Sequence, residues 1–457
     1  DKNKTERNVK MNFDALFAKT SNKVVRCGLV GIGDFGASLL TQAEHVPNLK
    51  IALICDRDPA RMAAAVAAAG ADPADMAIVQ DMDDADDIQL DVLVEATGNP
   101  EAAAAVGEQA IDRGQHLVMV SKEAAIVAGP ILHARASAKG LVYTEVEGDQ
   151  PSLLIGLMSW AKTIGLDVRA AGKSSEYDFV LGPDDSLTWR NQRHSNSGLT
   201  ALWKRNDMSW QGLTDAREAR AENLGLPTRT VPDFCEMGVV VNASGFTPDR
   251  PEFHTPILRP TELAEAFKRS ADGGLLAGDR RIDVFNCLRR ADEASFAGGV
   301  FILVNGHDDK TWDLLREKGH IVAEDAGVAV LYNPQHLLGI EAPLTILAAG
   351  LLGIPTGATD PKPVVDLVAR TNRDFAAGER LTITDAHHHE VGGLKPELIP
   401  AVRFAAANPC PYYLATGARL RKDVQAGTLV TAEMLEMNMG TVLARLRGEQ
   451  DQHFGFQ

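Results

Sequence analysis

The sequence is poor in cysteine, in aromatic residues and in positive charge. Its cysteines number five, and no pair of them has the spacing of metal ligands. An odd and scattered set of this kind argues against a disulfide framework. It predicts reduced thiols, which favours a cytoplasmic location. The five are Cys27, Cys55, Cys235, Cys287 and Cys410.

Acidic residues outnumber basic residues by 62 to 46, which leaves a formal net charge of −16. A surface of this sign repels nucleic acid and anionic membranes, so we expect neither as a partner. No apolar run reaches the length of a transmembrane helix. Residues 1–10 lack the apolar core of a signal peptide, and Met11 has the character of a natural start, which would make residues 1–10 an extension.

A strand, a glycine turn and a helix are predicted one after another from residue 24 onward. The apolar run 24–30 is typical of a buried parallel strand. In a G-x-G-x-x-G turn after such a strand, the first glycine permits the bend, the second lets backbone approach a pyrophosphate, and the third lets the helix pack closely. The start of that helix offers free N–H groups to phosphates. We therefore predict a dinucleotide site, rather than an ordinary glycine turn, at Gly31, Gly33, Asp34, Phe35 and Gly36.

The second strand of this unit ends at an acid that bears on the choice of cofactor. Asp56 lies 20 residues after Gly36, where a carboxylate can accept hydrogen bonds from the ribose hydroxyls of NAD and repel a 2′-phosphate. Arg57 beside it could instead recruit the 2′-phosphate of NADP. We predict NAD or NADP as the cofactor and favour NAD.

Further strands and helices alternate up to residue 150. The segments 77–80, 91–95, 114–120 and 141–146 are predicted to be strands, and the stretches between them to be helices. This pattern predicts a doubly wound parallel sheet, the Rossmann fold, over residues 20–150. Ligands of such sheets lie at the carboxyl ends of the strands. That rule nominates Thr97 and Gly98, Ser121 and Lys122, and Glu147 and Asp149.

Beyond residue 150 the composition changes twice. Residues 151–360 are predicted to form an α+β domain on a mixed sheet, which would serve substrate binding and oligomerisation. The last helix of this domain (343–352) is expected to pack back on the first domain. Segment 237–243 fits a helix or a strand. Residues 361–437 hold two copies of a strand, a basic-acidic pair, an Ala-Gly turn and a strand, which predicts a small β-rich module. Residues 1–19 and 438–457 are predicted tails, the second partly disordered.

These segments together resemble the homoserine dehydrogenase-like oxidoreductases. The resemblance is closer to the branch that carries a C-terminal SAF-type β-clip module and includes 1-deoxy-D-xylulose 5-phosphate reductoisomerase-like proteins. In homoserine dehydrogenases a lysine after the fifth strand helps to place the nicotinamide, and Lys122 matches it here, preceded by Ser121 rather than Asn. Lys173 matches a lysine region of the reductoisomerase-like branch. The segments that carry the resemblance are GLVGIGDFG (28–36), DVLVEATGNPE (91–101), GQHLVMVSKEA (114–124), EGDQPS (147–152), AGK (171–173) and NPQHLLGIEAPLT (333–345).

Hydride transfer requires a group that handles the proton of the alcohol. A partly buried lysine beside the cofactor can have its pKa lowered towards neutrality, which suits this role. We predict Lys122 and Lys173 as catalytic residues, against a capping or salt-bridging role. Asp149 and Glu147 are candidates for orienting a lysine or binding substrate hydroxyls, against a solvated turn.

Two weaker patterns allow alternative readings. The run 387–390, His-His-His-Glu, has the ligand types of a metal site, but consecutive residues point in different directions, so we predict a polar loop and no metal. The pairs Arg280–Arg281 and Arg289–Arg290 suit a substrate phosphate or, more commonly, salt bridges.

The predicted function is an NAD(P)-dependent oxidoreductase acting on a small polar hydroxy or keto compound, of the sugar acid or sugar phosphate kind. One alternative is a reductoisomerase of a ketose phosphate, which would need a divalent metal on carboxylates such as Asp149 and Glu147. A second alternative is a non-catalytic regulator that senses NAD(H). We expect a homo-oligomer, a dimer or a tetramer.

Overall fold

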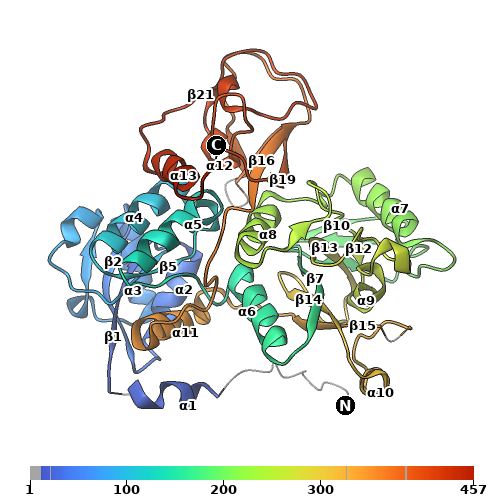
Figure 1. Cartoon of the computed structure of the whole chain (residues 1–457), viewed down its shortest axis with the longest axis horizontal. Coiled ribbons are helices and arrows are strands. Elements are labelled where there is room, and N and C mark those ends of the chain that lie inside the picture. Colours follow the sequence, from blue (N-terminus) through green and yellow to red (C-terminus); the bar gives the residue numbers. More distant parts are fainter. Residues whose placement is uncertain (1–11, 21, 326, 386–388, 457) are drawn as a thin grey trace.

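The computed structural model describes residues 12–20, 22–325, 327–385 and 389–456. Three parts follow one another along the chain (Figure 1): a blue-to-cyan lobe, a green-to-yellow lobe and an orange-to-red module. The short helix α1 (Phe13–Phe17) precedes the first lobe. Within the described ranges, every helix is too short or too polar to cross a membrane.

The first lobe is the predicted Rossmann fold. Its six strands pair in parallel in the order β3-β2-β1-β4-β5-β6, the order of two mononucleotide-binding halves. The central strands are almost wholly buried and rich in Val, Leu and Ile, as expected for a sheet covered on both faces. The strands are β1 (Val25–Val30), β2 (Leu49–Cys55), β3 (Ala77–Val79), β4 (Val92–Glu95), β5 (His116–Met119) and β6 (Tyr143–Glu145), and the helices are α2 (Asp34–Ala43), α3 (Pro59–Ala69), α4 (Pro100–Asp112) and α5 (Lys122–Ala138).

A helix from much later in the chain packs on this lobe. Helix α11 (Ala342–Leu347) and the π-helical turn η7 (Ala348–Leu352) pack against the sheet. Ala342, Ile346 and Ala349 lie in one buried cluster with side chains of β1 and β2. The chain therefore crosses from the second lobe back to the first before it enters the third.

The second lobe is built on a mixed sheet whose main path is β10-β9-β8-β13-β7-β14-β15. Segment 231–244, which holds the ambiguous run 237–243, is a helix, α8. The strands are β7 (Asp167–Ser174), β8 (Phe179–Leu181), β9 (Leu187–Trp189), β10 (Gln192–His194), β11 (Thr247–Pro248), β12 (Ile257–Leu258), β13 (Arg281–Arg290), β14 (Val300–Asn305) and β15 (Val328–Asn333), and the helices are α6 (Gln150–Thr163), α7 (Trp210–Asn223), α8 (Val231–Ser244), α9 (Leu263–Ala266) and α10 (Asp309–Glu317).

The third part is β-rich, and its two predicted repeats face each other. Phe375 and Val424 exchange backbone hydrogen bonds of 2.8 and 2.9 Å. Asp374 of the first repeat accepts a hydrogen bond from Ala426 N of the second, at 2.8 Å. Asp423 of the second repeat accepts one from Ala377 N of the first, also at 2.8 Å. This reciprocal pairing explains why the same short pattern occurs twice. The elements are β16 (Val365–Thr371), β17 (Ile383–Asp385), β18 (Glu390–Val391), β19 (Leu394–Pro400), α12 (Tyr412–Ala415), β20 (Arg419–Leu420) and β21 (Leu435–Glu436).

The prediction that the residues after 438 are partly disordered is wrong, because they contain helix α13 (Val442–His453). The carboxylate of Glu101 in α4 accepts hydrogen bonds from the first two N–H groups of α13. Arg447 is fully buried and ion-paired with Asp366 of β16 and with Asp451. The buried face of α13 is thus partly polar, which is why an apolar periodicity does not reveal it.

A glutamine of α13 bridges two backbone groups of α5 beside a proline. Pro130 has no N–H and so interrupts the hydrogen bonds of α5. The side chain of Gln450 donates to Val127 O at 3.1 Å and accepts from Ile131 N at 3.3 Å. Helix α13 therefore connects the third part of the chain to the first lobe through specific polar contacts (Figure 1).

Candidate active site at the carboxyl edge of the first sheet

The glycine turn after β1 has the geometry that a pyrophosphate requires. Gly31 has φ +94°, and a Cβ there would lie 2.3 Å from the carbonyl oxygen of Ala96. A Cβ on Gly36 would lie 2.1 Å from Gly31 O, so the helix can approach the strand only without a side chain. A Cβ on Gly33 would meet nothing within 4 Å, and no side chain caps α2. The N–H groups at the start of α2 are thus open to a dinucleotide phosphate, which these residues fit.

Asp34 and Phe35 form the first turn of α2, where Asp34 is exposed and Phe35 half-buried. At the end of β2, the carboxylate of Asp56 accepts hydrogen bonds from Ile32 N at 2.8 Å and Asp58 N at 2.9 Å. These bonds bring the acid onto the glycine turn, beside the place predicted for the ribose. The neighbouring Arg57 is exposed.

The loops after β4 and β5 are joined by a buried carboxylate. Glu95 is fully buried and accepts from Thr97 Oγ1 at 2.6 Å and from Ser121 Oγ at 3.0 Å. Ser121 Oγ in turn accepts from Gly98 N at 2.9 Å. Burial raises the pKa of Glu95, against hydrogen bonds from Thr97 and Ser121 that lower it. The predicted nicotinamide-side loops therefore lie together in one network.

Two lysines share one carboxylate at this edge of the sheet. Lys122, the first residue of α5, lies 2.5 Å from Glu236 Oε1 and 3.8 Å from Asp149 Oδ1. Lys173 of β7 forms ion pairs with Glu236 and, at 2.7 Å, with Asp233. The structure thus brings together three of the four predicted catalytic residues, from three different elements.

The two lysines differ in accessibility. The side chain of Lys173 is 1% exposed, and that of Lys122 is 23% exposed. Asp233, which holds Lys173, also accepts from Ser175 Oγ at 2.8 Å and Thr230 Oγ1 at 2.7 Å. Of the two lysines, only Lys122 has part of its side chain exposed.

The expectation of a lysine with a lowered pKa is wrong in this geometry. Burial lowers the pKa of Lys122, but the charges of Asp149 and Glu236 outweigh burial and hold that pKa well above its ordinary value. Burial also lowers the pKa of Lys173, but the charges of Asp233 and Glu236 outweigh burial. The pKa of Lys173 is therefore raised as well. Both lysines are ammonium ions at neutral pH.

Glu147, the fourth predicted residue, is turned away from this cluster. Its carboxylate accepts from Ser152 Oγ at 2.8 Å, whereas Asp149 caps the start of α6 and faces Lys122. Among the described residues, no group of three or more His, Cys, Asp or Glu side chains is arranged to hold a metal ion. His387 and His388 of the histidine run lie outside the described residues.

Sequence reasoning missed the acid that organises the site. Glu236 is 2% exposed and lies in α8 within an otherwise apolar run, with Asp233 one turn earlier. Two acids three residues apart in an apolar helix lie on one face and need buried cations as partners. That pattern was a usable signal. The pairing with Lys122 and Lys173 depends on tertiary packing alone.

The arginine pairs serve other contacts. Arg289 forms an ion pair with Asp178 at 2.5 Å, and Arg281 with Asp249 at 3.2 Å. Arg280 stacks on Phe246 at 4.7 Å, and Arg290 on Trp203 at 4.8 Å. These contacts favour a structural role for the four arginines over the binding of a substrate phosphate.

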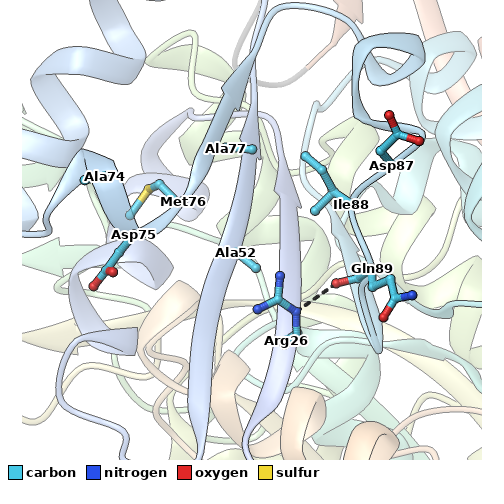
Figure 2. A pocket seen from close by; sticks show the side chains of 9 residues that line it. All are labelled: Arg26, Ala52, Ala74, Asp75, Met76, Ala77, Asp87, Ile88 and Gln89. Carbon is cyan, nitrogen blue, oxygen red and sulfur yellow. Dashed lines mark hydrogen bonds between the residues drawn. The ribbon is translucent and has the colours of Figure 1, made fainter.

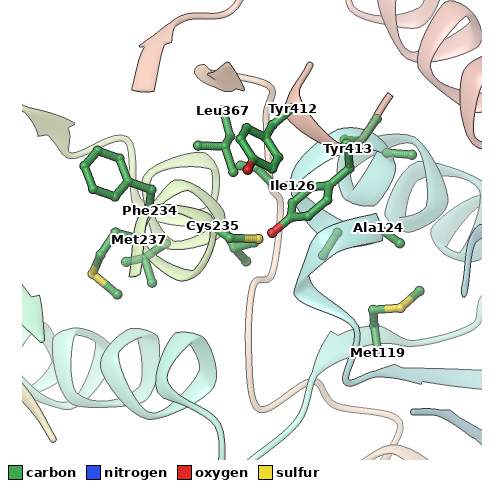
Figure 3. Close-up of a cluster of buried hydrophobic side chains, with 14 of the residues drawn as sticks. Met119, Ala124, Ile126, Phe234, Cys235, Met237, Leu367, Tyr412 and Tyr413 are labelled. Carbon is green, nitrogen blue, oxygen red and sulfur yellow. The ribbon is translucent and has the colours of Figure 1, made fainter. Parts of the chain in front are cut away.

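Three parts of the chain pack together behind the lysine cluster (Figure 3). Side chains from α5, α8 and α12 converge there, and the hydroxyl of Tyr413 points towards Cys235 Sγ. Glu123, next to Lys122, contacts His389 of the third part, with Glu123 Oε1 3.4 Å from His389 Nδ1. Burial raises the pKa of Glu123 to about 7. The third part of the chain therefore contributes to the surroundings of the site.

A surface pocket on the first lobe lies elsewhere (Figure 2). It is at the amino ends of β1, β3 and β4, where Arg26 donates to Gln89 O at 2.9 Å. None of the predicted site residues lines it. Ligands of open parallel sheets bind at the opposite, carboxyl edge, so this pocket is not the candidate site.

Two family models match the chain. Residues 27–145 match "Homoserine dehydrogenase, NAD binding domain", and residues 228–342 match "Oxidoreductase DRL, catalytic domain". Both descriptions are those of oxidoreductases, and the first match lies in the lobe that carries the glycine turn. The second match includes Asp233 and Glu236. A comparison with curated proteins finds no match.

A comparison with solved structures finds partial matches. The WlbA dehydrogenase from Bordetella pertussis, in complex with NADH and UDP-GlcNAcA, is 22% identical over 35% of this chain and 49% of its own, with a TM-score of 0.28. An oxidoreductase from Agrobacterium radiobacter, in complex with NAD+, L-tartaric acid and magnesium, is 18% identical over 34% of this chain and 45% of its own, with a TM-score of 0.27. The match thus spans less than half of each of these chains, and likeness at this level carries no conclusion about substrate.

Proposed function

We propose that this chain catalyses NAD(P)-dependent hydride transfer to or from a carbon of a small polar hydroxy or keto compound, of the sugar acid or sugar phosphate kind. One observation carries the proposal: Lys122, whose side chain is partly exposed, has its ammonium group held by Glu236 and Asp149 at the carboxyl edge of the first sheet. Its neighbour Ser121 contacts Gly98, in the loop expected beside the nicotinamide.

The residues divide the work between cofactor and substrate. Gly31, Gly33 and Gly36 would hold the pyrophosphate, and the nicotinamide would supply or accept the hydride when bound. Lys122 donates a hydrogen bond to the substrate oxygen and stabilises negative charge that develops on it. Lys173 is buried and positions Glu236, so it does not contact substrate.

The charges around the reacting group favour a neutral hydroxyl or keto group at this point. Two ammonium groups, of Lys122 and Lys173, face the three carboxylates of Asp149, Asp233 and Glu236. An anionic group of the substrate would therefore bind away from this cluster. The resemblance of the third part to SAF-type modules, which occur in carbohydrate enzymes, supports a sugar-like substrate.

We infer a preference for NAD over NADP from the position of Asp56. Its carboxylate is anchored on the glycine turn by Ile32 N, so a 2′-phosphate in the ribose position would meet a fixed negative charge. Asp56→Ser should narrow the difference between the two affinities. A wild-type preference for NADP would assign the choice to Arg57 instead.

The first experiment is a titration of NAD(H) and NADP(H), followed by a screen of sugar acids and sugar phosphates at 340 nm. Lys122→Met should bind cofactor as the unchanged chain does and lose turnover, whereas the surface variant Lys50→Met should lose neither. Turnover that requires Mg²⁺ or Mn²⁺ would favour the reductoisomerase alternative. Tight cofactor binding with no turnover would favour the regulatory one, and no binding would overturn the proposal.

We infer a homo-oligomer, a dimer or a tetramer, which are the commonest closed assemblies of soluble oligomeric proteins. Light scattering coupled to size exclusion tests this directly: a mass of about 49 kDa, that of one chain, would contradict it.

A further inference from the structure

The loop of residues 333–341 joins the two halves of the candidate site. Leu338 N donates to Gly148 O at 3.1 Å, next to Asp149. On its other side, a Cβ on Gly339 would lie 2.4 Å from Phe35 O, in the first turn of α2. The loop is therefore fixed between the cofactor-binding helix and the start of α6, and it carries one titratable ring, that of His336.

The imidazole of His336 lies beside a buried amide with an unused acceptor. A Cβ on Gly298 would lie 2.7 Å from His336 Nε2 and 3.0 Å from Gln150 Nε2, so the two side chains converge on this glycine. Gln150 is 3% exposed, and its Oε1 has no hydrogen-bond partner. Buried polar atoms are rarely left without a partner in a folded protein, and a bound hydroxyl group would satisfy this one.

In the part of the chain that the structure describes, neither ring nitrogen of His336 takes part in a hydrogen bond or an ion pair. The charged groups that act on the ring are those of the lysine cluster, Asp149, Lys173, Glu236 and Lys122. Burial lowers the pKa of His336, the charge of Asp149 raises it, and the net shift is downward. The ring is therefore neutral at pH 7 and can accept a proton, which the two lysines, already protonated, cannot.

We propose that His336 and Gln150 form a subsite for two adjacent hydroxyl groups of the substrate, with His336 as the proton acceptor of the reacting one. This inference rests on the proposed function. In the oxidation direction, the carbinol C–H bond breaks and its hydride passes to C4 of the nicotinamide of NAD(P)⁺, which becomes NAD(P)H. The O–H bond breaks, its proton passes to Nε2 of His336, and the C=O bond forms. Gln150 Oε1 accepts from a neighbouring hydroxyl group, and Lys122 holds the oxygen.

A chemical test requires no turnover. Diethyl pyrocarbonate modifies neutral, accessible imidazoles, and peptide mass spectrometry reports the modification of His336 separately from that of exposed His320. We expect modification of His336 to rise with a midpoint below 6.5, the ordinary histidine value. A midpoint at or above that value, or no modification while His320 reacts, would overturn the proposal.

The kinetic test uses the compound with the highest turnover in the screen. His336→Asn should lower kcat by about 100-fold or more and remove the acidic limb of the pH profile, with unchanged cofactor affinity. Gln150→Leu should raise KM more than it lowers kcat, and the control His320→Asn should change neither. If the unchanged chain turns over and His336→Asn retains its rate and pH profile, this inference alone fails. If the unchanged chain turns over no compound, the proposed function fails and this inference fails with it.

Discussion

Lys122 and Lys173 share Glu236, yet the removal of each lysine should affect a different property of the protein. Lys173→Met leaves Asp233 and Glu236, which are 1% and 3% exposed in their side chains, without their common cation. Lys122→Met removes a cation whose side chain is 23% exposed and leaves Glu236 paired with Lys173. The first variant should therefore be structurally damaged, and the second catalytically damaged.

The magnitude follows from the burial of the pair. Removing one partner of a buried ion pair costs about 3–5 kcal/mol, because the remaining charge is left without compensation. At about 1.4 kcal/mol per factor of ten, local opening around Lys173 should become about 10² to 10⁴ times more frequent. For Lys122→Met we expect a change of less than about tenfold, because its partner keeps a second cation.

Hydrogen exchange resolved to peptides measures this difference where it arises. Peptides covering β7 and α8 should lose protection in Lys173→Met and keep it in Lys122→Met, while peptides of α3 serve as an internal reference in both. The same preparations are then assayed for cofactor binding and turnover. Unchanged protection of β7 and α8 in Lys173→Met, together with a loss of turnover equal to that of Lys122→Met, would refute the division of roles and place Lys173 in contact with substrate.

Four further substitutions have definite expected outcomes. The pKa of Glu123 is raised to about 7 by burial, so the folded chain binds this proton more tightly than the unfolded chain. The free energy of unfolding should therefore fall as the pH rises from about 4.5 to about 7. Glu123→Gln should remove up to about 3 kcal/mol of that fall, measured by urea melts across pH. Gly33→Ala should weaken NAD binding without loss of stability, because a Cβ there meets nothing within 4 Å. Gly36→Ala should destabilise the chain, because its Cβ would lie 2.1 Å from a backbone oxygen. Calorimetry of cofactor binding and thermal melts distinguish the two effects, and equal effects of both variants would contradict the roles assigned to the two glycines. Arg447→Met leaves the buried carboxylate of Asp366 without its cation, so the free energy of opening α13, measured by hydrogen exchange, should fall by about 3–5 kcal/mol. Full protection of α13 in this variant would show that apolar contacts suffice.

The first lobe could be predicted from sequence because each of its signals is local. Its strands are continuous apolar runs, and Gly31, Gly33 and Gly36 stand at the spacing that a βα turn demands. The carboxyl-edge rule then nominated Lys122 and Asp149 without any knowledge of their partners.

The rest of the site depends on contacts between distant segments. Glu236 is 114 residues from Lys122 along the chain, and no local pattern announces that pair. His336 lies in a loop without periodicity, so nothing in its surroundings in sequence pointed to Gln150. The expected direction of the lysine pKa shift failed for the same reason: burial was foreseeable, but two partner carboxylates were not.

The bridging of α5 by Gln450 has a consequence for the order in which this protein is made. Val127 and Gln450 are 323 residues apart, so on the ribosome the proline-interrupted turn of α5 is synthesised long before the side chain that satisfies it. Lys122 stands at the start of that same helix. The catalytic edge of the Rossmann lobe therefore reaches its final rigidity only after α13 has emerged, which delays a competent site until residue 450 has been translated.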